Sequence, residues 1–341
     1  MRDVCVALIA VLAVTIPGCR IGAAPPSAPQ VRVGVAAPHV VREPPAFTAY
    51  IVNQNSDDVT AIDVASRTVI DRAPTGRNPH EIAASPDGSR LFTSDQEGGT
   101  ITVLDVSSFQ VIARWGGGAA PHGVETTQDG QRLLVTNGPR SELLVLDAST
   151  GQVVNRVPTG LGAHVVHRSP DGALAYVTNT VDASLTVVDL RAMQPVRTIP
   201  MGPGAEGLGV SPDGRWVYVA NRGADDVWVV DVNRFEVVAQ VPVHREPIRI
   251  VFSPDSAVAY VSQIAGDRIL AIDAGTRAIV GEYVAQSGPI GMAVSPDGRY
   301  LFAANIFSGT LSVIDTVTSE TVANIPAGDG PDGMVVLPRR E

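Results

Sequence analysis

A 42-residue repeat is the feature of this sequence that most constrains its fold. The motif Ser-Pro-Asp-Gly begins at Ser85, Ser169, Ser211 and Ser295, and variants of it begin at Thr127 and Ser253, so that successive starts are always 42 residues apart. Two other positions keep the same step through seven units: Asp63, Asp105, Asp147, Asp189, Asp231, Asp273 and Asp315, and Asn53, Asp95, Asn137, Asn179, Asn221, Gln263 and Asn305. Seven units without an insertion or deletion indicate one structural unit packed against copies of itself.

Each unit has the pattern of four short strands. In one unit, residues 217–221, 227–231, 237–241 and 247–252 are rich in β-branched and aromatic side chains and are separated by turn residues. Strands of this length without a helical period are typical of a propeller blade. The recurrent Asp and Asn residues stand at strand ends, where they are expected to bond the backbone of the next turn. The sequence therefore predicts an all-β, seven-bladed propeller with four-stranded blades.

The two ends of the repeat predict how the ring closes. The first unit lacks Ser-Pro-Asp-Gly, because residues 43–46 read Glu-Pro-Pro-Ala, and the chain enters at the strand near Tyr50. At the other end, residues 331–337 supply a strand with no unit to follow it. We expect this C-terminal strand to pair with the N-terminal strands in one mixed blade, which hides two sheet edges. The predicted propeller spans residues 46–337.

The N-terminus has the features of an export signal. Residues 4–15 form an apolar run behind Arg2 that is too short to span a bilayer and is typical of a signal peptide over residues 1–19. The run ends in Ile-Pro-Gly-Cys, which resembles a bacterial lipobox in which Cys19 would carry lipid. A plainly cleaved secreted protein and an uncleaved anchor are the alternatives. Residues 20–45, rich in Pro and Ala, are expected to form a tether. These features predict a membrane-anchored lipoprotein facing the periplasm or the cell exterior.

Composition excludes several kinds of chemistry. The formal net charge is −10 and the pI is about 5.1, so a nucleic-acid partner is disfavoured. All 25 basic residues are arginine, which excludes lysine-based catalysis. Both cysteines lie in the first twenty residues, so the propeller has no thiol nucleophile, disulfide or iron–sulfur cluster. Membrane contact is expected only through a lipid anchor, and the propeller is expected to be a monomer.

One unit carries a recognisable family pattern. Tyr176-Val177-Thr178-Asn179, with Ser-Pro-Asp-Gly upstream and Val187-Val188-Asp189 downstream, resembles the YVTN family of propeller repeats. The resemblance extends over residues ~43–337 and implies the fold, but the family includes surface-layer and periplasmic proteins of unknown role. It is similar more distantly to the haem d1 domain of nitrite reductase, to amine dehydrogenase propellers and to seven-bladed lactonases. Cys-x-x-Cys-His is absent, which excludes covalent c-type haem.

Candidate site residues are found where the units differ. By analogy with known propellers, the strand before each Ser-Pro-Asp-Gly is innermost, and its second position reads His80, His122, His164, Glu206, Ile248, Ile290 and Asp332. Three histidines at one height with a carboxylate nearby are an ordinary ligand set for zinc or copper. A polar pocket without metal is the alternative. So is a purely structural role, because Pro-His-Gly recurs in YVTN repeats.

The same strands carry five further polar residues. These are Glu81, Glu125, His167, Arg168 and Arg249. Buried charges are costly unless they are paired, so Glu125 with Arg249, or Glu81 with Arg168, are candidate ion pairs. Alternatively, Arg249 holds an anionic ligand.

Three functions fit these residues. The first is a binding propeller that engages a small molecule or another exported protein at one mouth of its channel. The second is a zinc or copper enzyme in which His80, His122 and His164 hold the metal and Glu125 or Glu206 serves as acid or base. The third is a lactonase-like hydrolase that uses a carboxylate, a histidine and an arginine at the channel mouth.

Overall fold

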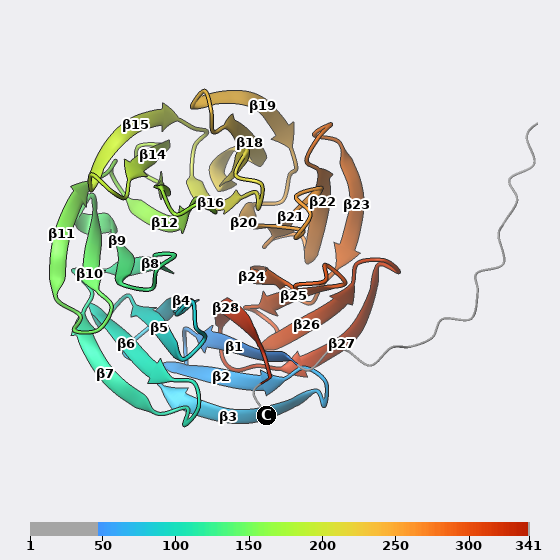
Figure 1. The fold of residues 1–341 in the computed structure, drawn as a ribbon. Coiled ribbons are helices and arrows are strands. Elements are labelled where there is room, and N and C mark those ends of the chain that lie inside the picture. The colour runs from blue at the N-terminus through green and yellow to red at the C-terminus, as the bar shows by residue number, and fades with distance from the viewer. Residues whose placement is uncertain (1–46, 340–341) are drawn as a thin grey trace, which may run out of the picture. The chain divides into compact units, whose positions relative to one another are not determined.

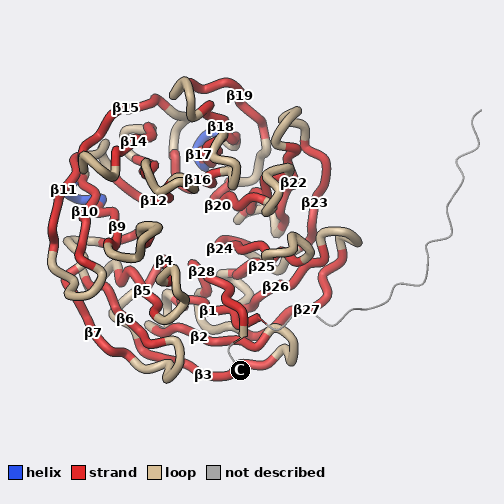
Figure 2. The backbone as a smooth tube through the Cα atoms, in the orientation of Figure 1, coloured by secondary structure: helices blue, strands red, loops and turns tan. Residues whose placement is uncertain are grey.

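The computed structural model describes residues 47–339, which form 28 strands and two short 3₁₀ helices. Seven four-stranded sheets are arranged around a central axis as the blades of a propeller (Figure 1). Figure 2 shows how little of this part of the chain is helical: only η1 (Gly138–Arg140) and η2 (Arg222–Ala224). Over residues 47–339, no helix has the length and apolar character needed to cross a membrane.

The seven blades follow the repeat of the sequence. The first combines β28 (Pro331–Pro338), β1 (Phe47–Asn53), β2 (Asp58–Asp63) and β3 (Thr68–Pro74). The next three are β4 (Pro79–Ala84), β5 (Arg90–Asp95), β6 (Thr100–Asp105) and β7 (Val111–Gly116); β8 (Pro121–Thr126), β9 (Arg132–Asn137), β10 (Glu142–Asp147) and β11 (Val153–Pro158); and β12 (Ala163–Arg168), β13 (Leu174–Asn179), β14 (Ser184–Asp189) and β15 (Gln194–Pro200). The last three are β16 (Ala205–Val210), β17 (Trp216–Asn221), β18 (Asp226–Asp231) and β19 (Glu236–Pro242); β20 (Pro247–Phe252), β21 (Val258–Gln263), β22 (Arg268–Asp273) and β23 (Ile279–Val284); and β24 (Pro289–Val294), β25 (Tyr300–Asn305), β26 (Thr310–Asp315) and β27 (Glu320–Pro326).

The predicted closure of the ring is confirmed. The strand β28 pairs antiparallel with β1, with Val335 opposite Tyr50 and Pro338 opposite Phe47. Figure 1 shows the red C-terminal strand inside the blue N-terminal strands. The fold class predicted from the sequence, including the mixed blade, is therefore correct.

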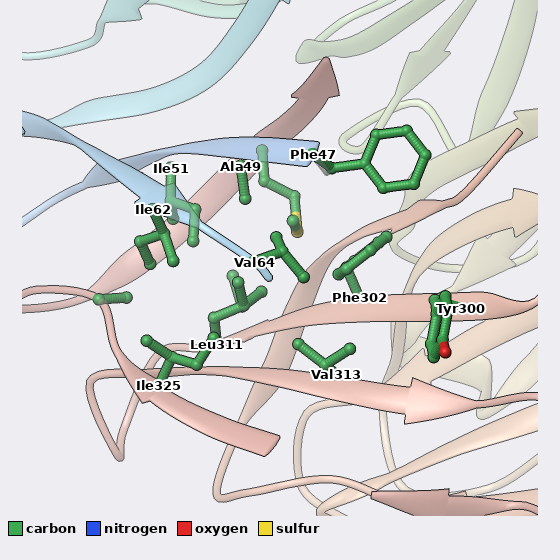
Figure 3. Packing of buried hydrophobic residues seen from close by; sticks show 13 residues of the cluster. Phe47, Ala49, Ile51, Ile62, Val64, Tyr300, Phe302, Leu311, Val313 and Ile325 are labelled. Atoms are coloured by element: carbon green, nitrogen blue, oxygen red, sulfur yellow. The ribbon is translucent and has the colours of Figure 1, made fainter. Parts of the chain in front are cut away.

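The core lies between neighbouring blades. In Figure 3, Ile51 and Ile62 of the first blade pack against Phe302, Leu311 and Ile325 of the last, and all five side chains are buried. Because the second and third strands of a blade are covered on both faces, they read as nearly continuous apolar runs. The outermost strands have exposed positions along most of their length. Packing between blades, which removes apolar surface from water, is the main stabilising term of this fold.

The Ser-Pro-Asp-Gly turn is held by its own side chains. Ser169 Oγ donates to Asp171 Oδ1 at 2.5 Å and accepts from the Leu174 amide at 2.9 Å. Asp171 Oδ1 also accepts from the Ala173 amide, and Gly172 adopts a φ of 71°, which favours glycine. Each motif therefore builds one tight turn between an innermost strand and the next strand of the blade.

Threonine in the Tyr-Val-Thr-Asn pattern joins one blade to the next. Thr178 Oγ1 accepts from the Val165 amide at 3.1 Å and donates to the Glu206 carbonyl oxygen of the following blade at 2.6 Å. The same double contact is made by Ser94, Thr136 and Ser262. These four hydroxyls fill the irregular register at the start of β4, β8, β12 and β20 and so hold neighbouring innermost strands at one height.

Candidate functional site

The candidate site residues occupy three levels along the innermost strands, β4, β8, β12, β16, β20, β24 and β28. Those seven strands lie nearest the axis in Figure 1. The second residue of each strand lies at what we call the histidine mouth, and the fifth and sixth lie near the Ser-Pro-Asp-Gly turns, at what we call the turn mouth. Three residues of extended chain separate these levels by about 10 Å. The residues singled out from the sequence therefore form two separate groups with Glu81 and Arg249 between them.

At the histidine mouth, the three predicted histidines do come together. The ring centroids of His122 and His164 are 3.6 Å apart in a stacked arrangement, and those of His80 and His122 are 4.6 Å apart. His122 is only 5% exposed, and Nδ1 of both His122 and His164 is buried without a hydrogen-bond partner among the described residues. Burial lowers the pKa of His164 to about 3 and that of His122 well below its usual value, and neighbouring positive charge adds to both effects. Both rings are therefore neutral at physiological pH.

The stacked geometry bears on the predicted metal site. A metal is held by imidazole nitrogens in the plane of each ring, whereas stacked rings turn their faces to one another. Within residues 47–339, no group of three or more His, Cys, Asp or Glu side chains has an arrangement that could hold a metal ion. Zinc or copper binding by His80, His122 and His164 thus requires a rearrangement of these side chains, and it stays a prediction.

His80 and Asp332 are held in a network of their own. His80 Nδ1 lies 3.1 Å from Asp332 Oδ2, and His80 Nε2 lies 2.9 Å from Asn78 Oδ1. Gln54 Nε2 donates to Asp332 Oδ2 at 2.5 Å. Burial by itself would raise the pKa of Asp332, but the hydrogen bond from His80 and the charge of Arg249 outweigh it and lower the pKa. Asp332 is therefore a buried carboxylate.

Glu206, the fourth polar residue at this mouth, faces a different partner. Its Oε2 lies 3.7 Å from Nη1 of Arg222, whose Nη2 also contacts Glu246 at 2.7 Å. Burial raises the pKa of Glu206, although Arg249 and Arg222 oppose the shift. The two predicted acid/base candidates, Glu206 and Glu125, lie on different levels and do not share one site.

Between the mouths, Arg249 makes an ion pair with Glu81 across the channel. Arg249 Nη2 hydrogen-bonds Glu81 Oε1 and lies 3.8 Å from Asp332 Oδ1. The two intervening strands carry Gly291 and Gly333 at the equivalent position, so no side chain stands between the partners. Ion pairing among the charged side chains of these strands, one of the two alternatives predicted, is present, but the partners differ from the predicted ones. The predicted pairs Glu125 with Arg249 and Glu81 with Arg168 are wrong, because Glu125 and Arg168 lie two or three residues further along their strands.

The turn mouth joins a carboxylate, a histidine and an arginine. His167 Nδ1 lies 3.1 Å from Glu125 Oε2, and Glu125 Oε1 accepts from the Thr126 amide at 3.1 Å. Arg168 Nε donates to the Thr126 carbonyl oxygen at 3.1 Å and lies 3.9 Å from Glu125 Oε1. The backbone of β8 thus fixes the carboxylate and the guanidinium, and the carboxylate orients the imidazole.

Two adjoining cavities meet at this group. A chamber of about 180 Å³ has Glu81 and Arg249 in its lining together with apolar side chains, including Met292 and Met334. A groove of about 500 Å³ opens toward the Ser-Pro-Asp-Gly turns and is lined by Arg168 among others. Four residues line both cavities: Glu125, His167, Ile250 and Val251. The channel is therefore accessible at the turn mouth as far as the Arg249–Glu81 pair.

Sequence reasoning missed several residues of the site. Gln54 and Arg222 follow the recurrent Asn at the end of the second strand, where the other units have Gln96, Gly138, Thr180, Ile264 and Ile306. The residue type at that position varies from unit to unit, and this variation is the sequence signal that could have identified Gln54 and Arg222 as candidates. Met292 and Met334 occupy equivalent positions of neighbouring strands. An apolar residue that lines a cavity has the same sequence pattern as one in the packed core, so the sequence does not distinguish the two.

Comparison with known proteins identifies the family. The sequence model of the cytochrome D1 heme domain matches residues 133–249 and 220–338, which together cover more than half of the chain. The chain belongs to this family. No match was found among curated proteins.

Solved structures share the fold. Hydrazine synthase of Kuenenia stuttgartiensis is 21% identical, with a TM-score of 0.73 over 79% of this chain and 92% of that one. A protein of unknown function from Desulfotomaculum acetoxidans is 15% identical, with a TM-score of 0.75 over 85% and 98%. Dihydro-heme d1 dehydrogenase NirN, in complex with DHE, is 19% identical, with a TM-score of 0.64 over 84% and 74%. At these identities the likeness concerns the fold alone.

The family name implies a haem, which the residues present do not fit. A tetrapyrrole needs a slot that covers most of its surface, and pockets for ligands of even ordinary size have volumes of about 300–1,000 Å³. The chamber has about 180 Å³, and the groove beside it, of about 500 Å³, is more open to solvent and does not cover a ligand on most sides. At the other mouth the histidine rings stack directly on one another, with no space for a macrocycle between them. We therefore derive no chemistry from a haem.

Proposed function

We propose that this chain is a binding propeller that takes a small molecule at the turn mouth of its channel. The adjoining cavities that share Glu125 and His167 carry this proposal. The chamber, of about 180 Å³, has room for a small group only, which favours a small molecule over a protein segment. The groove gives the remainder of the ligand access from solvent.

The repeat provides an internal argument that these polar residues serve a ligand. The position held by Glu125 and His167 is occupied in the other five blades by small or apolar residues: Ala83, Gly209, Val251, Ala293 and Val335. The fold therefore does not need polar side chains there. A half-exposed contact between two polar side chains contributes little to stability, about 0–1 kcal/mol. Two neighbouring blades thus carry polar side chains at a position that is small or apolar in the other five.

Filling the chamber tests this function. A panel of short carboxylic acids, alcohols, amines and lactones is screened by ligand-observed NMR against the parent and against Val251→Trp, whose indole would occupy the space that the chamber and groove share. Val317→Trp, at a 74% exposed position far from the channel, is the control. We expect at least one class to bind the parent and the control but not Val251→Trp. Absence of binding to the parent, or equal binding by Val251→Trp with an unchanged melting temperature, contradicts the proposal.

A metal-dependent enzyme at the histidine mouth is the alternative function. Metal analysis of tag-free parent and His122→Ala, after incubation with zinc or copper, decides it. A stoichiometric metal in the parent that His122→Ala loses supports the alternative, and a parent without bound metal rejects it.

We also propose that the protein is exported and lipid-anchored through Cys19, which lies outside the described residues. Cys19→Ser should lose lipid labelling and move from the membrane fraction to the soluble fraction. Unchanged partitioning of the variant contradicts a lipid anchor at this residue.

A further inference from the structure

We propose that the turn mouth hydrolyses carboxylic esters, open-chain or cyclic, with His167 as the general base. This proposal rests on the binding function and names its ligand class. The roles follow from three neighbouring groups: the imidazole of His167, the carboxylate of Glu125 and the guanidinium of Arg168.

The arrangement of His167 is that of an oriented base. Nδ1 contacts Glu125 Oε2 at 3.1 Å, whereas Nε2 makes no hydrogen bond to any described residue. The side chain is 43% exposed and lines both the chamber and the groove. A carboxylate on Nδ1 fixes the tautomer that leaves Nε2 as the acceptor and stabilises the imidazolium that forms when Nε2 takes a proton. Because Glu125 is itself held by the Thr126 amide, the pair is organised before a ligand arrives.

Arg168 supplies the positive charge that ester hydrolysis requires. Its described contacts use Nε, which donates to the Thr126 carbonyl oxygen, and its side chain lines the groove. The remaining N–H groups of the guanidinium are able to donate to a carbonyl oxygen on which negative charge develops.

The reaction needs only water and the ester. The oxygen of a water molecule forms a bond to the ester carbonyl carbon while Nε2 of His167 takes one of its protons, and Arg168 stabilises the resulting oxyanion. The tetrahedral intermediate then expels the alkoxide, which takes the proton from Nε2. One water is consumed, a carboxylic acid and an alcohol form, and a cyclic ester gives a single hydroxy acid. No redox partner is required.

The cavities select the substrate. The chamber of about 180 Å³ has apolar walls that include Ile82, Val124 and Met292, so we expect it to take a short aliphatic acyl or ring portion. The open groove takes the departing alcohol. Small aliphatic esters and lactones of five- and six-membered rings are therefore the class predicted.

Proton release measured in a pH-stat tests the activity with δ-valerolactone and ethyl butyrate, two unactivated esters. We expect turnover by the parent and a fall in kcat of about 100-fold or more for His167→Gln, with little change in KM. Glu125→Gln and Arg168→Gln should lower kcat as well, with melting temperatures unchanged. His244→Gln, at an exposed loop histidine, is the control and should match the parent.

The outcomes separate this inference from the proposed function. If the parent binds esters or lactones by NMR but releases no protons above the buffer rate, the hydrolytic role is wrong and the binding role stands. Equal kcat in parent and His167→Gln also rejects it. If the parent neither binds nor hydrolyses, both proposals fail. For Glu125, a loss of kcat without loss of stability supports positioning of His167, whereas a lower melting temperature with unchanged kcat indicates a purely structural pair.

Discussion

At the scale of single residues, the histidine mouth shows how burial sets protonation. His122 and His164 are stacked neutral imidazoles whose depressed pKa values come first from desolvation. A histidine whose pKa is lower in the folded than in the unfolded state binds fewer protons when folded. It therefore contributes its full stability above the unfolded pKa, about 6.5, and that stability is lost as the pH falls toward the folded pKa.

We accordingly expect the stability of chelator-treated protein to decline between pH 6.5 and about 3, the value for His164. Each buried histidine contributes a slope of at most about 1.4 kcal/mol per pH unit. The free energy of unfolding from denaturant titrations at several pH values measures it. His164→Gln should flatten the slope between pH 6.5 and 4.5, where turn carboxylates such as Asp105 and Asp147, with pKa values of about 2, are still ionised. A slope that is the same in parent and variant contradicts the assignment.

At the scale of secondary-structure elements, a hydroxyl links neighbouring innermost strands at the same position of four blades. The other three blades have Val52, Ala220 and Ala304 at this position, and the matching innermost residues are Gly333, Gly207 and Gly291. In all three cases an added Cβ would collide with a carbonyl oxygen of the next strand. The chain thus joins adjacent blades in two ways, by a bridging hydroxyl or by direct approach of the backbone at a glycine.

This pairing predicts the effect of Thr178→Val. Valine keeps the volume but leaves the Val165 amide and the Glu206 carbonyl oxygen without their buried partner, and Val165 cannot make the close approach of glycine. We expect a loss of about 1–3 kcal/mol in the free energy of unfolding. Thr68→Val, at an exposed strand position, should change it by less than about 0.5 kcal/mol. Equal stability of the two variants would show that the bridge contributes nothing.

At the scale of the whole molecule, the ring is closed by one pairing between the ends of the propeller. The strand β28 completes the first blade, and the buried cluster of Figure 3 joins that blade to the last one. Without β28, β1 would expose a sheet edge, and β4 and β24 would each lose an innermost neighbour.

Deleting residues 331–341 should therefore destabilise the entire ring and lower the melting temperature by more than about 10 °C, rather than fray one blade. Thermal unfolding followed by far-UV circular dichroism measures this change, and deletion of residues 339–341 alone is the control. Melting of the long truncation at the parent temperature with the same cooperativity would show that closure is not what holds the ring together.

The sequence by itself determined the fold and its closure, because both depend on periodicity. The 42-residue step sets the number of blades, and the missing first motif sets which strand closes the ring. The same 42-residue step predicted that His80, His122 and His164 lie at one height along the channel, because equivalent positions in a ring of repeats are related by rotation.

Only the tertiary structure decided how these side chains meet. Rotational symmetry brings backbones together but does not determine whether imidazoles stack or converge, and here they stack. Ion pairing depends on the level along the strand and on what stands between the partners, so Arg249 reaches Glu81 across Gly291 and Gly333. The contact between Glu125, His167 and Arg168 beside an open cavity likewise depends on side-chain directions and on empty volume. The spacing of residues along the sequence determines neither of them.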